Sequence, residues 1–233
     1  MNPIGFSTGA IALGDYSRAL LLLSNISTTA IELSALRVNE IGPLIEALPA
    51  LDLAKYQYIS IHAPSSYLPE QEQGIAELLW AIPARFAIIL HPDAIHDAAL
   101  WKPFGSRVAI ENMDRRKLIG RTVKELEHCF SSLPDARFCF DIGHARQVDP
   151  SMTEAYLILN RFSDRLVQVH VSEVDAQSKH ALISYAAELA FADVARFVPE
   201  WVPLILESRV TPNQIQSEIF RALDIFSRPA FAA

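Results

Sequence analysis

Short runs of apolar and β-branched residues recur along the whole chain, separated by longer segments of mixed polarity. The runs lie at residues 3–8, 30–34, 58–62, 86–91, 107–112, 137–141, 166–172 and 203–208. Runs of this length and composition are typical of strands buried in a sheet. In the seventh run, Gln168, His170 and Ser172 alternate with valines, which places the polar set on one face of the strand. The pattern therefore predicts eight strands.

The segments between these runs are expected to form helices, because their apolar residues recur at helical spacing. They cover residues 15–26, 40–51, 69–82, 93–101, 121–133, 151–163, 191–198 and 211–226. Two of them have recognisable start signals. Ser151 with Glu154 is a candidate capping box, and Thr211 followed by Pro212 suits an N-cap with proline at the first helical position.

Strand and helix thus alternate along the chain, with run centres roughly 29 residues apart, which is about one βα unit each. This regularity predicts a parallel (β/α)8 TIM barrel, an α/β fold, with residues 1–233 in a single domain. A doubly wound open sheet is the structural competitor. No GxGxxG or GxxxxGK[ST] loop follows the first run, so the competitor lacks its usual phosphate-binding signature.

Composition narrows the partners. With 51% hydrophobic residues and a net charge of -7, the chain can bury a large core and is poorly suited to bind nucleic acid, so a small-molecule substrate is expected. Cys129 and Cys139 lack metal-binding or disulfide spacing and indicate free thiols in a reducing compartment. No apolar segment is long enough to span a membrane, which favours a cytoplasmic protein. The pattern does not indicate an oligomeric state.

Seven consecutive runs carry an acidic or histidine residue at or near their carboxyl ends. These residues are Glu32, His62, His91, Glu111, Asp141, His170 and Glu207. Barrel enzymes place their chemistry at this face, so we expect the seven side chains to converge at one rim. Several carboxylates at one rim would repel one another unless a cation lay among them. Mixed nitrogen and oxygen ligands predict Zn²⁺ or Mn²⁺ in the first place, with Fe²⁺ or Co²⁺ as alternatives.

Six short motifs at these ends, in chain order, resemble one superfamily. They are "SIHAP" at 60–64, "LHPD" at 90–93, "IEN" at 110–112, "DIGHA" at 141–145, "VHVSE" at 169–173 and "LES" at 206–208. The sequence is similar over essentially its whole length to the xylose-isomerase-like barrels, which include endonuclease IV and many sugar isomerases and epimerases. The resemblance implies a metal site formed by Glu111, Asp141, His170 and Glu207, in which the two glutamates also exchange a proton with the substrate carbon.

The endonuclease IV branch implies additional ions, so that one to three are expected. His62 and His91 match histidines that join the glutamate at position 111 in holding a second zinc. His144 and His180 match two ligands of a third zinc, whose remaining ligand is an aspartate where this chain has Ser178. Asp175 is a candidate replacement for that aspartate. His144 equally suits a residue that orients Asp141, and the loop after His180 lacks the glycines of relatives, so a different backbone path is expected there.

Some rim residues are open to two interpretations. Glu32 suits either a hydrogen-bonding support for the rim or a substrate contact. Arg146 and Arg209 follow the sixth and eighth runs, where they could bind a phosphate or carboxylate of the substrate or remain solvated surface charges. We expect no chemical role for His96 and His128, and packing rather than binding roles for Trp80, Trp101 and Trp201.

Two kinds of enzyme fit these residues. The first is a metal-dependent isomerase or epimerase of a small sugar, polyol or related hydroxy-carbonyl compound, with Glu111 and Glu207 transferring the proton. The alternative is a multi-zinc phosphoesterase related to endonuclease IV, which His62 and His91 favour. Ser178, the acidic net charge and the lack of Lys/Arg-rich loops count against a DNA-repair enzyme. A barrel that retains metal for binding alone is a third, non-enzymatic hypothesis.

Overall fold

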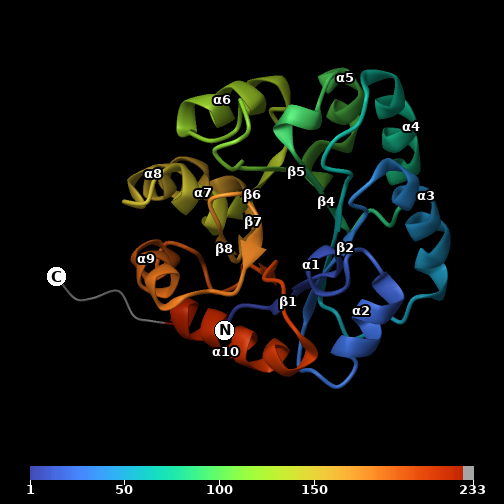
Figure 1. Cartoon of the computed structure of the whole chain (residues 1–233). Coiled ribbons are helices and arrows are strands. Elements are labelled where there is room, and N and C mark those ends of the chain that lie inside the picture. The colour runs from blue at the N-terminus through green and yellow to red at the C-terminus, as the bar shows by residue number, and fades with distance from the viewer. Residues whose placement is uncertain (228–233) are drawn as a thin grey trace.

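Eight parallel strands close into a barrel in the computed structural model, which describes residues 1–227, and helices surround that barrel (Figure 1). The strands are β1 (Ile4–Ser7), β2 (Ala30–Ser34), β3 (Tyr58–His62), β4 (Ala87–Leu90), β5 (Val108–Glu111), β6 (Arg137–Asp141), β7 (Leu166–Val171) and β10 (Leu204–Leu206). Each strand lies in one of the predicted runs. The barrel closes because β1 pairs with both β2 and β10. The predicted single-domain (β/α)8 barrel is confirmed.

The helices that follow the strands are α2 (Tyr16–Leu23), α3 (Val38–Ala47), α4 (Pro69–Trp80), α5 (Ala98–Trp101), α6 (Val123–Ser132), α8 (Thr153–Phe162), α9 (Tyr185–Ala195) and α10 (Ile215–Ser227). Short 3-10 turns occupy Leu48–Ala50, Pro92–Ala94, Lys102–Arg107, Ser163–Arg165 and Pro212–Gln214. Every predicted helical segment overlaps one of these helices. Two short helices were not predicted, α1 (Thr8–Ala12) and α7 (Ile142–Val148), and α9 begins before the expected residue 191.

The two predicted helix starts have different outcomes. The capping box at Ser151 is wrong, because α8 is preceded by Met152 at φ 60° and the Glu154 N–H donates to Asp149 Oδ2 at 2.9 Å. The Glu154 carboxylate instead accepts from the backbone N–H of Val123 at 2.6 Å. The start at Thr211 is confirmed, since Pro212 opens the 3-10 turn that leads into α10.

The main apolar core lies between the barrel and its helices, whereas a much smaller apolar cluster of Ile89, Ala109 and Cys139 fills part of the barrel interior. Trp101 is fully buried in the main core, and Trp80 packs edge-on against Phe104. Trp201 is 65% exposed, so its predicted packing role is wrong. Within residues 1–227, no helix combines the length and apolar character needed to cross a bilayer.

A hairpin of β8 (Glu173–Val174) and β9 (His180–Ala181) follows β7 and is paired outside the barrel sheet. It packs closely on α7 at Gly143. A Cβ atom at this position would lie 2.3 Å from the carbonyl oxygen of Ser172 and 2.8 Å from Val174 Cγ2. Gly143 is therefore required by the close approach of the hairpin, which brings His180 toward the rim.

Candidate metal centre

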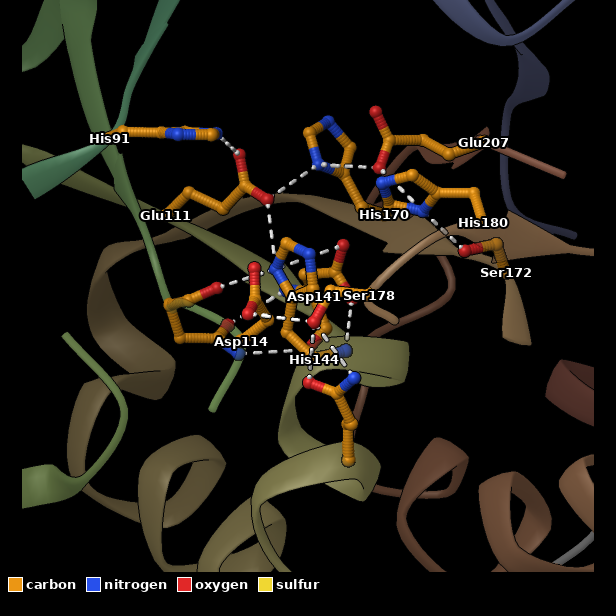
Figure 2. Close-up of polar contacts among 12 residues, drawn as sticks. His91, Glu111, Asp114, Asp141, His144, His170, Ser172, Ser178, His180 and Glu207 are labelled. Carbon is orange, nitrogen blue, oxygen red and sulfur yellow. Dashed lines mark hydrogen bonds and ion pairs between the residues drawn. The ribbon is translucent and has the colours of Figure 1, made fainter. Parts of the chain in front are cut away.

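A cavity of about 260 Å³ opens at the carboxyl ends of the barrel strands. Its walls include the predicted residues His62, His91, Glu111, His144, His180, Glu207 and Arg209. Figure 2 shows several of these side chains converging, with His91, His144 and His170 all directed at Glu111. The strand ends meet at one rim, as predicted, because a closed parallel barrel brings the carboxyl ends of all its strands to the same face.

Glu111, the last residue of β5, lies at the centre of the cluster with only 1% of its side chain exposed. Its Oε2 atom lies 3.2 Å from His62 Nε2 and 3.4 Å from His91 Nε2. Its Oε1 atom lies 3.3 Å from the Nδ1 atoms of both His144 and His170. Each carboxylate oxygen therefore faces its own pair of imidazoles.

The six predicted ligands form two groups that share Glu111. His62, His91 and Glu111 make up the first, and Glu111, Asp141, His170 and Glu207 make up the second, with ligand atoms within 4.8 Å of one another in each group. A further group joins Glu111 and His170 to the buried thiol of Cys139. Neither the composition nor the strand-end pattern predicted this group. In the second group, Asp141 Oδ2 and His170 Nδ1 are buried and make no hydrogen bond. Such atoms fit a cation, which would supply the missing partner.

Asp141 is held by the end of the neighbouring strand. The Asn112 side chain donates to the Asp141 carbonyl oxygen at 2.8 Å and accepts from the Asp141 N–H at 2.7 Å. Asp141 Oδ1 in turn accepts the His144 N–H at 2.6 Å as the N-cap of α7. The cap uses one carboxylate oxygen and leaves the other directed at the cluster.

The charges of the cluster are unequally balanced. Burial alone would raise the pKa of Glu111, but His170 and His91 hold that pKa well below its usual range. Burial raises the pKa of Asp141 to about 6, with help from Glu111 and Glu207. Burial together with Glu111 also raises the pKa of Glu207. These last two carboxylates lack sufficient positive charge around them, which a bound divalent ion would provide.

The histidines next to Glu111 do not all shift in the same direction, since burial lowers the pKa of His91 whereas the pKa values of His62 and His144 are raised. Burial acts to lower the pKa of His62 and His144, but the nearby carboxylates outweigh it and raise the two values to about 9 and about 10. The His62 Nδ1–H donates to the Ala63 carbonyl at 2.7 Å, so its Nε2 faces Glu111. A backbone carbonyl therefore fixes the ring in the orientation that a metal ligand needs.

His144 and His180 are close to each other but have other partners. Their ring centroids are 5.6 Å apart, the Nδ1 atom of His144 lies 3.0 Å from the Asn112 carbonyl oxygen, and that of His180 lies 2.8 Å from Ser172 Oγ. Within residues 1–227, these two histidines form no potential metal-binding group with a third ligand. The predicted third ion therefore has only two of its ligands in place.

The two candidates for the remaining ligand are both engaged elsewhere. Ser178 donates to Asp114 at 2.8 Å and accepts from Gln147 at 2.8 Å. Asp175 caps its own turn, accepting the N–H groups of Gln177 and Lys179 at 2.8 and 2.9 Å, and it does not line the cavity. The proposed replacement of the aspartate by Asp175 is not supported by this geometry.

Asp114 is a cavity residue that the strand-end pattern missed. Its side chain is almost fully buried and accepts from the Arg116 backbone and guanidinium groups at 2.8 and 3.1 Å. Burial acts to raise its pKa, but Arg116 and Ser178 hold it at about 2, so the carboxylate is charged. It comes three residues after Glu111, and its position next to "IEN" was the available sequence signal. Lys117 also lines the cavity, with Nζ 2.6 Å from Asp93 Oδ2.

The remaining predicted residues fall into different places. Glu32 is fully buried 2.9 Å from His170 Nε2 and does not line the cavity, which favours its role as a support. Arg209 lines the cavity and is exposed. Arg146 does not line the cavity and pairs with Glu173 at 2.9 Å.

The residues without an expected chemical role lie outside the cavity walls. His96 bonds to the Tyr67 carbonyl and His128 is an exposed helix residue, while Cys129 and Cys139 are free thiols.

Comparison with known proteins shows the fold. No protein-family model matches the chain, and no curated protein matches it. Among solved structures, SacUVDE is similar with a TM-score of 0.58 and 16% identity over 96% of both chains. A xylose isomerase domain protein from Alicyclobacillus acidocaldarius has a TM-score of 0.64 and 12% identity, covering 97% of this chain and 98% of that one.

A third similar structure, described as a sugar phosphate isomerase/epimerase from Anabaena variabilis ATCC 29413, has a TM-score of 0.57 and 14% identity. The similarity covers 100% of this chain and 90% of that one. The chain therefore has the fold of the xylose-isomerase-like TIM barrels, as its motifs predicted. Identities this low carry no reaction or substrate from one protein to another.

Proposed function

We propose that this chain is a divalent-metal-dependent hydrolase of small phosphate esters. The observation that carries the proposal is the position of Glu111 between two groups of ligands, with one carboxylate oxygen facing His62 and His91 and the other facing His170. A carboxylate with this arrangement suits a bridge between two ions. Two ions, when bound, would activate water and stabilise the charge of a phosphate in an in-line displacement.

The residues present fit such a pair of ions. His62 and His91 would hold one ion together with Glu111, while Asp141, His170 and Glu207 would hold the other. The fit rests on the buried Asp141 Oδ2 and His170 Nδ1 atoms, which make no hydrogen bond, and on the raised pKa values of Asp141 and Glu207. These features are costly in the protein alone and favourable beside a cation. Zn²⁺ and Mn²⁺ suit this mixed donor set.

Hydrolysis is favoured over proton transfer at carbon by the state of Glu111. Its side chain is 1% exposed, both oxygens face imidazoles, and its pKa lies well below the usual range. A general base works best when its pKa lies near the working pH and when it reaches the proton that it removes. Glu111 therefore suits a ligand better than one of two proton-transferring glutamates.

The cationic residues of the cavity favour a small anionic substrate. Arg116 and Lys117 line one side and are oriented by Asp114 and Asp93, respectively. Arg209 lines the cavity too and makes no hydrogen bond or ion pair with another of residues 1–227. An unpaired guanidinium suits a phosphate group outside the reacting centre. A cavity of about 260 Å³ and a net charge of -7 favour a small ester over nucleic acid.

A sugar isomerase or epimerase is the second candidate, because Glu111 and Glu207 lie on either side of His170 Nδ1 at 3.3 and 3.5 Å. In that reaction Glu207, with its raised pKa, would be the better proton-transferring residue. Arg209 would then bind the phosphate of a sugar phosphate.

One pair of measurements separates the two candidates. Protein purified without chelators is analysed for metal, and then assayed for release of p-nitrophenol from p-nitrophenyl phosphate and its diester. The proposal expects two metal equivalents and hydrolysis that a chelator abolishes. One equivalent, with incorporation of deuterium from D₂O into a carbon-bound position of sugar phosphates and no hydrolysis, would instead support the isomerase.

A further inference from the structure

We infer that Glu32 is a positioning residue for the metal centre: it holds the Nε2 proton of His170 so that Nδ1 is left to bind a cation. The inference rests on the metal centre of the proposed function and does not depend on which reaction that centre performs. It gives a role to a buried carboxylate that neither lines the cavity nor belongs to either group of ligands.

The contact between Glu32 and His170 has a defined direction. Both side chains are fully buried, and Glu32 Oε2 lies 2.9 Å from His170 Nε2. A charged carboxylate can only accept a hydrogen bond, so this contact places the proton on Nε2. The other ring nitrogen, Nδ1, faces Glu111 and Glu207 and has no hydrogen-bond partner. A neutral imidazole with its proton on Nε2 presents a lone pair at Nδ1, which is what a metal requires.

Further residues inside the barrel hold Glu32 in place. The Gln168 side-chain nitrogen donates to Glu32 Oε2 at 2.7 Å, and Ser60 Oγ donates to the same oxygen at 3.3 Å. The Tyr58 hydroxyl donates to Gln168 Oε1 at 2.8 Å and thereby fixes the amide orientation. These residues lie on β2, β3 and β7, which the closed sheet holds together. The carboxylate therefore has little freedom to turn away from His170.

Gln168 offers the alternative explanation. Its side-chain nitrogen also lies 2.7 Å from His170 Nε2, so it could donate to that atom and leave the ring proton on Nδ1. A lone pair on Nε2 would then face the Glu32 carboxylate at 2.9 Å, which is electrostatically unfavourable. Nδ1 also faces carboxylates, at 3.3 and 3.5 Å, but Glu32 is the nearer one and a cation bound at Nδ1 would take the place of a proton there, so Glu32 is favoured as the acceptor from His170, with Gln168 as a second donor to the same oxygen.

The charge of Glu32 adds to its orienting effect. Glu32 Oε1 is buried without a hydrogen-bond partner, so hydrogen bonds from the protein stabilise only one oxygen of this carboxylate. A positive charge at His170 or beyond it would stabilise this carboxylate, and the carboxylate would in turn make the imidazole a stronger ligand. By contrast, the ring of His62 is oriented by the neutral carbonyl of Ala63. Partners behind a metal-binding histidine typically change metal affinity by about 10- to 100-fold.

The test compares Glu32→Gln with Glu72→Gln. Glu72 is also a buried carboxylate, but it accepts from the Trp101 side chain and the His96 backbone outside the cavity. Zn²⁺ affinity is measured by competition with a chromophoric chelator, and the Co²⁺ absorption spectrum is recorded for each variant. We expect Glu32→Gln to weaken Zn²⁺ binding by about 10- to 100-fold and to alter the Co²⁺ spectrum. Glu72→Gln is expected to leave affinity and spectrum unchanged, whatever its effect on the unfolding temperature.

Equal Zn²⁺ affinity in wild type and Glu32→Gln would overturn the inference, as would an equal loss in Glu72→Gln. Weakening by Gln168→Met but not by Glu32→Gln would assign the His170 contact to Gln168 and would also overturn it. If Glu32→Gln does not fold, as judged by near-UV circular dichroism, Glu32→Asp replaces it, because it keeps the charge and lengthens the contact. A wild-type protein that binds metal through this contact but hydrolyses no phosphate ester overturns the proposed function alone.

Discussion

Two pairs of histidines line the same cavity, and they differ in what lies between them. His62 and His91 both direct Nε2 at one oxygen of Glu111, at 3.2 and 3.4 Å. The ring centroids of His144 and His180 are 5.6 Å apart, against 4.9 Å for His62 and His91, but no carboxylate joins His144 and His180 into a group of three ligands within residues 1–227. Their nearest partners include a backbone carbonyl and the Ser172 hydroxyl. The comparison shows that two histidines become a credible metal site through the acid between them.

The most damaging change should be the loss of the carboxylate that joins the first pair to the second group of ligands. We expect Glu111→Gln to lower kcat/KM for phosphate esters by roughly 10³-fold or more, because it removes a ligand from both ions. Metal analysis and steady-state kinetics check this. The Glu72→Gln protein serves as the control, and retention of two metal equivalents by Glu111→Gln would refute the bridging role.

Replacement of each histidine pair tests the comparison directly. The double variant His62→Ala/His91→Ala should lose one metal equivalent, since those side chains supply two of the three ligands in their group. The double variant His144→Ala/His180→Ala should keep both equivalents. Metal content after dialysis without chelator distinguishes them, with His128→Ala as a surface control. Loss of an ion from the second double variant would show that its histidines bind metal after all.

A smaller effect is expected from the two arginines that follow the sixth and eighth strands of the barrel. Arg209 lines the cavity without an ion-pair partner among residues 1–227, whereas Arg146 is paired with Glu173. Arg209→Met should raise KM for a phosphate ester about 10-fold with little change in kcat, because it removes binding that is equal in the ground and transition states. Arg146→Met should leave both constants near wild type. Equal effects of the two changes would remove Arg209 from the substrate site.

The smallest effect concerns pH, in protein kept free of metal by a chelator. Burial acts to lower the pKa of His62, but the Glu111 hydrogen bond and the Glu32 charge raise it to about 9, whereas burial lowers the pKa of His180 to about 4. An unfolded histidine titrates near 6.5. His62 therefore contributes stability that is fully present below about pH 6.5 and lost as the pH rises through about 9. His180 acts oppositely, destabilising the fold as the pH falls from about 6.5 toward 4.

Urea unfolding at several pH values checks these opposite signs. The difference in the free energy of unfolding between wild type and His62→Ala should shrink between about pH 6.5 and 9. The stability of His180→Ala relative to wild type should increase as the pH falls from about 6.5 toward 4. Parallel stability curves for the three proteins would contradict both assignments.

The sequence predicted the strands well because a strand buried in a parallel barrel needs a continuous apolar run, which is local information. It also placed Glu111, Asp141 and His170 together, since parallel strands deliver their carboxyl ends to one rim. The capping box predicted at the start of α8 was wrong because the Glu154 N–H donates to Asp149 and not to Ser151, and because the Glu154 carboxylate accepts from the backbone of α6. That choice depends on contacts distant in the chain.

The missed parts of the site have the same origin. Helix α7 begins directly at the end of β6, so Asp141 is both the last residue of the strand and the N-cap of the helix, the two roles that its position in the sequence had left open. Asp114 belongs to a loop, and its meeting with Ser178 joins residues 64 positions apart. Glu32 was open to two interpretations because only the closed barrel shows that it lies behind His170 and not in the cavity wall. Loop conformation and long-range contacts of this kind are not encoded in a local pattern.

The paired hydrogen bonds between the Asn112 side chain and the backbone of Asp141 have a consequence for ion selectivity. They copy the two-way exchange of a strand ladder with one side chain, and so tie the spacing of Glu111 and Asp141 to the rigid sheet. Within residues 1–227, no side chain clamps the backbone of Glu207 in this way, and Glu207 is the most exposed of these acids, at 12%. An ion of larger radius would therefore be accommodated by outward movement of Glu207. The residue after β10, rather than the ends of β5 or β6, would then set the tolerance of the site for ion size.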